Sequence, residues 1–464
     1  MSADAAMKER KPQLSASTSQ PCNSGAGRSS TADGTRNPAL LLSSDRQNSE
    51  SSDEPWPISS TWRWRILGEL AEVKLGKMLD KAKHTSGHRL PYLRNVNVRW
   101  GAVDTSDLLE MNFDEGQLER FGLKANDVLV CEGGEPGRAS VWNGRMPNVK
   151  FQKALHRVRF NVPYEPRMLV YFLELLAKSG RLERRFTGST IKHLTREAFI
   201  RLPVPLPPAD EQRQIVAEIE KQFTRLDAGV AALRRVQANL KRYRAAVLKA
   251  ACEGRLVPTE LNLWRQMSLA ELLRSEDIFN DGDWVESKDQ DPNGEVRLIQ
   301  LADVGDGTFR NRSNRFLTKV KAIELGCTFL KRGDILIARM PDPLGRACIF
   351  PGVEQESVTV VDVCIIRSLQ HHYDSRWLMY AINSSDIRAQ VSALQAGSTR
   401  KRISRKNLST IRLRVPPLVE QTLIVAEVER RLSVIEELEG TVAANLQRSI
   451  RLRQSILRRA FSAA

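Results

Sequence analysis

Apolar residues recur at every seventh position in two stretches of the chain. The first stretch, residues 211–251, contains no proline and places apolar side chains at Ile219, Leu226, Leu233, Leu240 and Val247. The second keeps this spacing at Val428, Ile435, Val442 and Ile456, with Ser449 interrupting it. A seven-residue apolar repeat over four heptads is typical of a coiled-coil seam. We therefore predict two helices, over residues 209–255 and 418–464, that pair with each other. The alternative is that each packs on its own globular domain.

The two predicted helices open with nearly the same sequence. PPADEQRQIVAEIEKQF (207–223) and PPLVEQTLIVAEVERRL (416–432) are identical at nine of seventeen positions. Other segments also return after 207–209 residues: LKANDVLV as LKRGDILI, Gly-Arg-Ala as Gly-Arg-Ala, and GSTIKHLT as GSTRKRIS. This period is too long for a solenoid unit. It indicates a duplicated domain followed by a duplicated helical connector.

Short apolar segments broken by Gly, Asn, Asp and Pro fill the rest of the chain. Examples are NDVLVCEGG (126–134) and VTVVDVCIIR (358–367). Such segments predict strands. We expect an α+β fold with two β-rich domains, the first over residues 56–208 and the second over 256–417, related by a pseudo-two-fold internal repeat.

Residues 1–55 differ in composition from everything that follows. They are rich in Ser, Gly, Asn and Asp and show little apolar periodicity. Such a segment buries too little apolar surface to offset the entropy of ordering it. We expect a disordered Ser-rich tail, or a start codon placed too early.

The charge of the chain favours a polyanionic partner. The net charge is +16, and residues 1–57 hold six Lys/Arg against seven Asp/Glu, so the rest carries +17. A basic folded portion favours nucleic acid first. The alternative is a soluble protein that happens to be basic.

Composition also bounds the compartment. The chain is 41% hydrophobic, with no uninterrupted apolar run long enough to predict a transmembrane helix. Its six cysteines are scattered without a Cys-x-x-Cys pair, which argues against a disulfide framework and a structural zinc site. We expect a cytoplasmic protein without a membrane partner.

A duplicated domain on double-stranded DNA would meet two half-sites related by symmetry. The two domains have diverged outside their shared segments, since VNVRWGAVDTSDLLEMNF (96–113) has no close counterpart in ADVGDGTFRNRSNRFLTK (302–319). We therefore expect an asymmetric, bipartite DNA target whose spacer is set by the helices.

Basic loops are the strongest candidates for contact with DNA phosphates. The GSTRKRISRK stretch supplies Arg400, Lys401, Arg402, Arg405 and Lys406, and its first-domain counterpart supplies Lys192, His193 and Arg196. Cations beside small hydroxyl donors suit a phosphate clamp. The alternative is a solvated charge run, but recurrence at the same place in both domains favours DNA contact.

Two further sets complete the DNA-binding candidates. Arg138 and Arg346, in the twin Gly-Arg-Ala turns, could grip a phosphate or read guanine, or instead pair with a local carboxylate. Base reading should lie where the domains differ, because Asn pairs with adenine and Arg with guanine in the major groove. The candidates are Asn95, Asn97, Arg99 and Trp100, and then Arg310, Asn311, Arg312 and Asn314. The alternative for each is ordinary loop polarity.

Catalytic motifs are weak or missing in the sequence. NVPY (161–164) lacks the second proline of the Asn-Pro-Pro-Tyr motif of amino-methyltransferases, and ESK (286–288) lacks the preceding Asp of a nuclease core. No GxxxxGK phosphate-binding loop occurs, and the six histidines show no metal-ligand spacing. We predict no catalytic residues, no metal site and no cofactor in this chain.

From about residue 56 onward the chain resembles the specificity subunit of type I restriction–modification enzymes. The resemblance is carried by WRWRILGELAEVKLGKML, YLRNVNVRWG, VCEGGEPGRA, QKALHRVR, LIQLADVGDGTF and both PPxxEQ helix openings. It implies two target-recognition domains separated by two antiparallel conserved helices. The Ser-rich segment 1–55 is a departure that the family pattern does not need.

The resemblance also implies a role and partners. A non-catalytic subunit of this kind docks two adenine-methylating modification subunits and two ATP-driven restriction subunits, so S-adenosylmethionine, ATP and Mg²⁺ are expected on the partners. A self-contained modification enzyme is disfavoured by the missing methyltransferase signatures. A coiled-coil scaffold without sequence specificity is disfavoured by two divergent domains on a shared frame.

Overall fold

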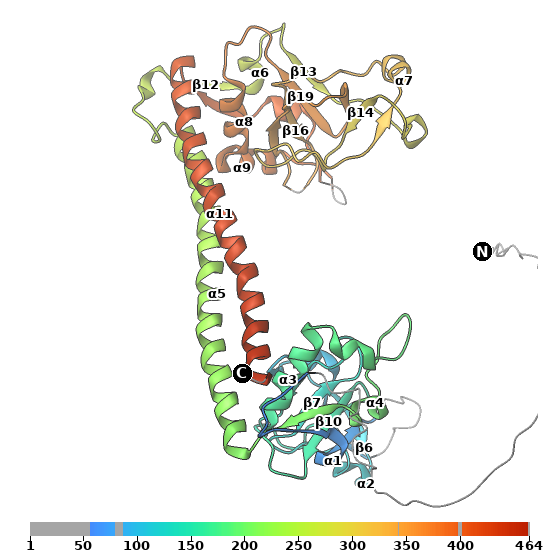
Figure 1. Ribbon diagram of the computed structural model, residues 1–464. Coiled ribbons are helices and arrows are strands. Elements are labelled where there is room, and N and C mark those ends of the chain that lie inside the picture. The colour runs from blue at the N-terminus through green and yellow to red at the C-terminus, as the bar shows by residue number, and fades with distance from the viewer. Residues whose placement is uncertain (1–55, 79–86, 342, 398–400, 463–464) are drawn as a thin grey trace, which may run out of the picture. The chain divides into compact units, whose positions relative to one another are not determined.

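The computed structural model describes residues 56–78, 87–341, 343–397 and 401–462 (Figure 1). The predicted disordered tail, residues 1–55, and the candidate Arg400 lie outside these ranges. Within them, helices and strands form a mixed α+β fold. None of the described helices is both long enough and apolar enough to cross a bilayer.

The first domain is built around a central four-stranded sheet. Its order is β2 (Ala71–Leu75), β10 (Leu155–Phe160), β7 (Val128–Cys131) and β8 (Ala139–Val141). A second sheet has the order β6 (Leu109–Phe113), β3 (His88–Leu93) and β9 (Lys150–Phe151), with β3 and β9 parallel. Two antiparallel pairs are β1 (Arg63–Ile66) with β11 (Pro203–Leu206), and β4 (Val98–Arg99) with β5 (Ala102–Val103).

Helix α3 (Pro166–Lys178) covers β7 and β8 of the central sheet. Its buried face includes Met168, Phe172 and Leu176, at the spacing of an amphipathic helix. Pro166 occupies the first helical position, where its missing N–H costs no hydrogen bond. The shorter helical elements are α1 (Leu67–Leu70), η1 (Asn95–Asn97), α2 (Glu115–Leu118), η2 (Arg181–Arg185) and α4 (Arg196–Ile200).

The second domain repeats three of these four sheets, with their strands in the same order. The central sheet is β13 (Ile278–Asp281), β19 (Val363–Arg367), β16 (Ile335–Ala338) and β17 (Ala347–Ile349). The next is β15 (Phe316–Leu317), β14 (Val296–Ile299) and β18 (Ser357–Thr359), with β14 and β18 parallel. β12 (Arg265–Ser268) pairs with β20 (Arg412–Val415).

Helix α8 (Ser375–Asn383) packs on β17, as α3 packs on β8. Asp374 accepts hydrogen bonds from the first backbone amides of α8 and so caps the helix. The shorter helical elements of this domain are η3 (Leu261–Leu263), α6 (Leu269–Leu272), η4 (Ser287–Asp289), α7 (Lys319–Glu324), α9 (Ser385–Ala393) and α10 (Arg405–Ser409).

Two helices of 44 residues each follow the domains, α5 (Ala209–Cys252) and α11 (Leu418–Phe461). Both begin directly after a proline pair, and acidic residues in their first turns complement the positive end of the helix dipole. α5 ends three residues earlier than predicted, because Gly254 adopts the left-handed conformation, with φ of 68°.

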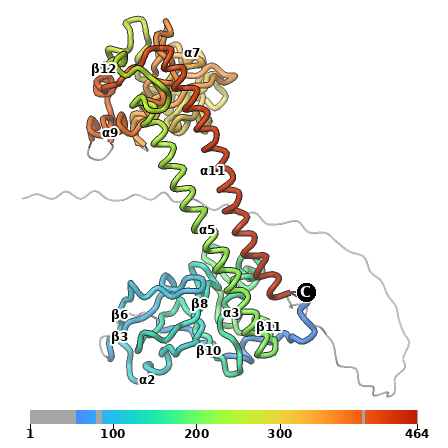
Figure 2. Tube along the Cα trace, turned by 90° about the vertical axis from the view of Figure 1, so that its left-hand side faces the viewer, coloured from blue at the N-terminus to red at the C-terminus, as the bar shows by residue number. Residues whose placement is uncertain are grey.

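α5 and α11 lie side by side in both views (Figures 1 and 2) and run antiparallel. Arg244, late in α5, lies 3.6 Å from Glu436 in the first half of α11. Arg453, late in α11, lies 3.4 Å from Asp227 in the first half of α5. The late part of each helix therefore lies beside the first half of the other, as in an antiparallel pair.

The apolar positions predicted for the seam all turn inward. Ile219, Leu240, Val247, Val428, Ile435 and Val442 are buried, and Leu226, Leu233 and Ile456 are half-buried. Where Ser449 interrupts the repeat, the helices leave a groove of about 450 Å³, which is also lined by Gly229. Small side chains at these two positions cannot fill the space that larger apolar residues fill elsewhere.

Each domain core also takes in a segment of both helices. The main core of the first domain includes Ile219 and Phe223 of α5, and Leu457 and Phe461 of α11. The corresponding core of the second domain includes residues from the end of α5 and the beginning of α11, such as Val247 and Val428. The two alternatives for the helices therefore both hold, because the helices pack on each other and on the domains.

Candidate nucleic-acid interface

The two basic loops have matching backbone pairs at their base. Thr187 and His193 exchange backbone hydrogen bonds of 2.8 and 2.9 Å, and Ala396 and Arg402 exchange the same pair. We call residues 187–193 the first basic loop and residues 396–402 the second basic loop. Each is followed by a short helix, α4 or α10, capped by a Thr or Ser side chain.

The cations of these loops differ in whether they already form contacts within the protein. Lys192, Lys401 and Lys406 are exposed. Arg402 lies 3.2 Å from Asp362, and its side chain is 41% exposed. The lysines are therefore the best placed of these residues to contact an external phosphate.

The remaining predicted clamp residues make contacts within the protein. Arg405 donates to the carbonyl oxygen of Phe279 at 2.7 Å, and Arg196 donates through Nε to the carbonyl oxygen of Val73 at 2.8 Å. His193 is half-buried beside Gly133. Arg196 and Arg405 are nevertheless exposed, so part of each side chain faces solvent.

Different buried side chains anchor the two loops. In the first domain, His156 is fully buried, and its Nε2 lies 2.8 Å from the carbonyl oxygen of Leu194. Burial lowers the pKa of His156 to about 4, so the ring is neutral at neutral pH and donates through Nε2. In the second domain, buried Arg339 donates through Nε to the carbonyl oxygen of Ile403 at 3.0 Å and pairs with Asp281 at 2.5 Å.

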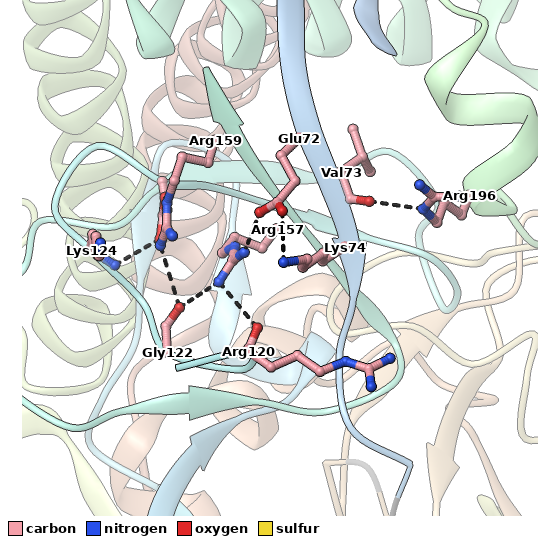
Figure 3. A network of polar contacts seen from close by, with 10 residues as sticks. Glu72, Val73, Lys74, Arg120, Gly122, Lys124, Arg157, Arg159 and Arg196 are labelled. Carbon is pink, nitrogen blue, oxygen red and sulfur yellow. Dashed lines mark hydrogen bonds and ion pairs between the residues drawn. The ribbon is translucent and has the colours of Figure 1, made fainter. Parts of the chain in front are cut away.

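A network of arginines joins strands β2 and β10 to the loop that precedes β7 in the first domain (Figure 3). Arg157, 1% exposed, donates to Glu72 at 2.6 Å and to the carbonyl oxygen of Gly122 at 2.7 Å. Arg159 donates to both carboxylate oxygens of Asp127, each at 2.7 Å. The hydrogen bonds that Arg159 donates to Asp127 raise the pKa of its guanidinium.

Three further cations, which are not among the candidates predicted from the sequence, surround this network. Lys74 lies 2.6 Å from Glu72, and its hydrogen bond, together with that from Arg157, lowers the pKa of the Glu72 carboxyl against the effect of burial. Arg120 and Lys124 are exposed, and Figure 3 shows the Arg120 side chain extending away from the network. Lys74 lies on β2, whereas Arg120 and Lys124 lie on the loop between α2 and β7, so no single run of charge in the sequence marks the three as a group.

Part of the network recurs in the second domain. Arg367 donates to both carboxylate oxygens of Asp334, at 2.7 and 2.6 Å. The backbone amide of Lys331 donates to Asp334 at 2.7 Å, as that of Lys124 does to Asp127. The repeated Leu-Lys-x-x-Asp segments therefore each hold a buried carboxylate that ties the loop before β7 or β16 to the neighbouring strand of the sheet, β10 or β19. This pair stabilises the fold and leaves no charge free for DNA.

Arg138 and Arg346 are also held inside the protein. Arg138 pairs with Glu135 at 2.9 Å and donates to the carbonyl oxygen of Asn95 at 2.8 Å. Arg346, 4% exposed, donates to four backbone carbonyl oxygens, including those of Val304 and Leu301. Burial lowers the pKa of Arg346. The geometry assigns both residues to holding the turn rather than to reading or gripping DNA.

Asn97 is another candidate whose side chain is buried rather than exposed at the surface. It is 3% exposed, accepts from the amide of Arg94 at 2.9 Å, and donates to the carbonyl oxygens of Asp104 and Asp107. With its amide group used in this way, it has no edge to present to a base. Polarity alone suggested a base contact, whereas burial makes Asn97 the organiser of its loop.

The other first-domain candidates lie around Asn97 with varying freedom. Arg99 is exposed on β4. Asn95 and Trp100 are half-buried, and Trp100 donates through its indole N–H to Glu135 at 2.9 Å. Arg99 is therefore the best placed of the four to contact DNA bases.

The corresponding loop of the second domain is organised by Asp303. This fully buried carboxylate accepts from the backbone amides of Gln300, Arg312 and Ser313 and from the Ser313 hydroxyl. The side chains of Arg310, Asn311, Arg312 and Asn314 remain exposed. Asn97 and Asp303 thus both hold their loops from inside. The side chains exposed on the two loops are different.

The described residues contain no group of three or more His, Cys, Asp or Glu side chains that could hold a metal ion. The described cysteines, all unpaired, are Cys131, Cys252, Cys327, Cys348 and Cys364, and burial raises the pKa of each. What the described surface offers instead is exposed cations and amides on loops, which is the chemistry of contact with phosphates and base edges.

The comparisons with known proteins agree with one another. Residues 59–231 match the model of the type I restriction modification DNA specificity domain. The chain is 24% identical over 384 residues to the EcoKI specificity subunit of Escherichia coli K12, covering 80% of this chain and 82% of that protein. It is 26% identical over 389 residues to the StySPI specificity subunit of Salmonella potsdam, covering 80% and 81%.

A solved structure shares the fold. A chain from work on complex assembly and conformational transition of the type I R-M system superposes with a TM-score of 0.70 at 19% identity, covering 88% of this chain and 99% of that one. The mixed α+β architecture described above is therefore that of a known fold.

Proposed function

We propose that this chain, which is related along most of its length to the specificity subunits of type I restriction–modification enzymes, is the non-catalytic subunit that selects the DNA target of such a complex. The proposal includes a bipartite, asymmetric target, with one half-site contacted by each domain.

The observation that carries the proposal is the same loop framework presented twice with different exposed side chains. Asn97 and Asp303 hold equivalent loops from inside, while Arg99 is exposed on one, and Arg310 and Arg312 on the other. A shared framework with divergent exposed residues suits two domains that read different bases. The second basic loop, with Lys401 and nearby Lys406, would add phosphate contacts without sequence preference.

The antiparallel helices α5 and α11 would act as the spacer between the half-sites and as the docking surface for partners. We infer two modification subunits, which would methylate adenine with S-adenosylmethionine, and two restriction subunits, which would use ATP and Mg²⁺. This part of the proposal rests on the family relationship.

Mapping methylated adenines across the genome, in cells with and without this chain, tests the proposal. We expect one asymmetric, bipartite motif to lose its methylation when the chain is deleted and to regain it when the chain is restored. An unchanged methylation pattern in a strain that expresses intact modification subunits would refute the proposal.

A further inference from the structure

A buried glutamine fixes the first turn of α5. Gln212 is 2% exposed and donates through Nε2 to the carbonyl oxygen of Pro207 at 2.9 Å. Its Oε1 accepts from the backbone amide of Glu165 at 2.7 Å. Because Glu165 immediately precedes α3, one side chain links the start of α5 both to its own leading loop and to the helix that covers the central sheet.

Two further contacts hold the same end of α5. The indole N–H of Trp62, next to β1, donates to Glu211 at 2.7 Å. About two turns beyond Gln212 along the domain-facing side, Glu220 accepts two hydrogen bonds from Arg167 of α3, at 2.8 and 3.0 Å. α5 is thus attached to two different elements of the first domain within its first three turns.

The start of α11 repeats these contacts. Gln421, also 2% exposed, donates to the carbonyl oxygen of Pro416 at 2.9 Å and accepts from the amide of Asp374 at 2.8 Å. The other two contacts recur as Trp264 with Glu420, at 2.8 Å, and Arg376 with Glu429, at 3.2 and 3.3 Å. The repeated Pro-Pro-x-x-Glu-Gln opening is therefore a repeated attachment between a domain and its following helix.

A small change in the angle of a long helix at its base moves the far end of the helix by a large distance. A 44-residue helix is about 66 Å long, so a tilt of about 3° moves its far end by about 3.4 Å, the rise of one base pair. Apolar packing is non-directional, whereas each hydrogen bond constrains both a distance and a direction, so bonds from one buried side chain to two separate segments restrict rotation of the helix about its base. The buried glutamines are suited to suppress it.

We propose that Gln212, Gln421, Glu220 and Glu429 are positioning residues that hold each long helix at a set angle to its domain, and thereby limit the spacer lengths that the protein accepts. The inference rests on the proposed function, because it concerns the distance between the two half-sites of one target. It assigns these residues no contact with DNA.

The test uses the complete complex of this chain with its modification subunits. Plasmids carry the two half-sites with the native spacer or with one or two base pairs added or removed, and methyl transfer to each is measured. One variant joins Glu220→Gln with Glu429→Gln, and a second joins Gln212→Leu with Gln421→Leu. Glu218→Gln is the matched control, because Glu218 lies on the same helix and, among the described residues, bonds only to Lys221 and Gln222 of its own helix.

We expect both variants to reduce the preference for the native spacer over its one-base-pair neighbours by a factor of roughly 5 to 30, which corresponds to about 1–2 kcal/mol. The half-site sequences and the control should be unchanged. Arg167→Glu or Glu220→Arg alone should also weaken the preference for the native spacer. The double variant, Arg167→Glu with Glu220→Arg, exchanges the two charges and should keep more of this preference than either single variant.

Other outcomes have distinct meanings. Glu220 is partly exposed, so its replacement should leave the domain folded even if loss of the buried glutamines does not. If the Glu220 and Glu429 variant keeps the full spacer preference, or loses activity equally at every spacer, the positioning role is wrong. If the unaltered complex methylates no bipartite site at all, the proposed function itself fails.

Discussion

Replacing Lys401 and Lys406 with alanine tests whether the second basic loop and the following helix grip the DNA backbone. Both lysines are exposed, whereas Arg402 lies beside Asp362 and Arg405 donates to the carbonyl oxygen of Phe279. The two arginines are thus partly engaged within the protein, and the lysines should supply most of the contribution of this region to phosphate binding.

The magnitude follows from counterion release. Each phosphate neutralised on duplex DNA contributes about 0.9 to the slope of log affinity against log salt, so loss of two contacts should lower the slope by about 1.8. Between about 50 and 200 mM salt, this change reduces the ratio of wild-type to variant affinity about tenfold. The variant should bind most weakly, relative to wild type, at low salt.

Salt titrations of binding to target and non-target DNA provide the assay, using the complete complex. A matched variant, with Lys401→Arg and Lys406→Arg, keeps both charges and should keep the wild-type slope. The reasoning is refuted if the alanine variant retains the wild-type slope. It is also refuted if binding weakens on the target alone or the preferred bases change, because the lysines would then contact bases.

Four other outcomes are expected. Inserting seven residues after Leu233 and after Val442 preserves the apolar seam and lengthens the helix pair by about 10 Å, so methylome mapping should show a spacer longer by about three base pairs and unchanged half-sites. The purified chain alone should neither methylate nor cut DNA, which incubation with labelled S-adenosylmethionine, and with ATP and Mg²⁺, would check. Asp303→Ala leaves several buried donors and Arg297 without their carboxylate, so urea unfolding should show a loss of about 3–5 kcal/mol. Burial lowers the pKa of His156 to about 4, so between about pH 6.5 and 4 the unfolded state binds more protons than the folded state. The free energy of unfolding should therefore fall by up to about 3 kcal/mol as the pH is lowered over this range. The loss should be smaller in His156→Gln.

Local patterns in the sequence were sufficient to predict the long helices. The proline pairs mark their first residues, the seven-residue repeat identifies the inward side chains, and Gly254 ends α5 near the predicted position. These features act within a few turns of one helix, so they can be read without knowing the rest of the fold. The family resemblance seen in the sequence is likewise confirmed by the comparisons.

The role of each polar candidate depended on the tertiary structure. Asn97, Arg346 and Arg99 are all polar residues near a turn, yet the first two are buried on internal partners and only Arg99 is exposed. The hydrogen-bond partners of Arg346 include carbonyl oxygens more than forty residues away, which no local pattern specifies. The contacts of the repeated Glu-Gln pair could not be predicted for the same reason, because their partners lie in distant segments. Charge and periodicity are properties of a segment, whereas burial and hydrogen bonding are decided by distant segments that folding brings into contact.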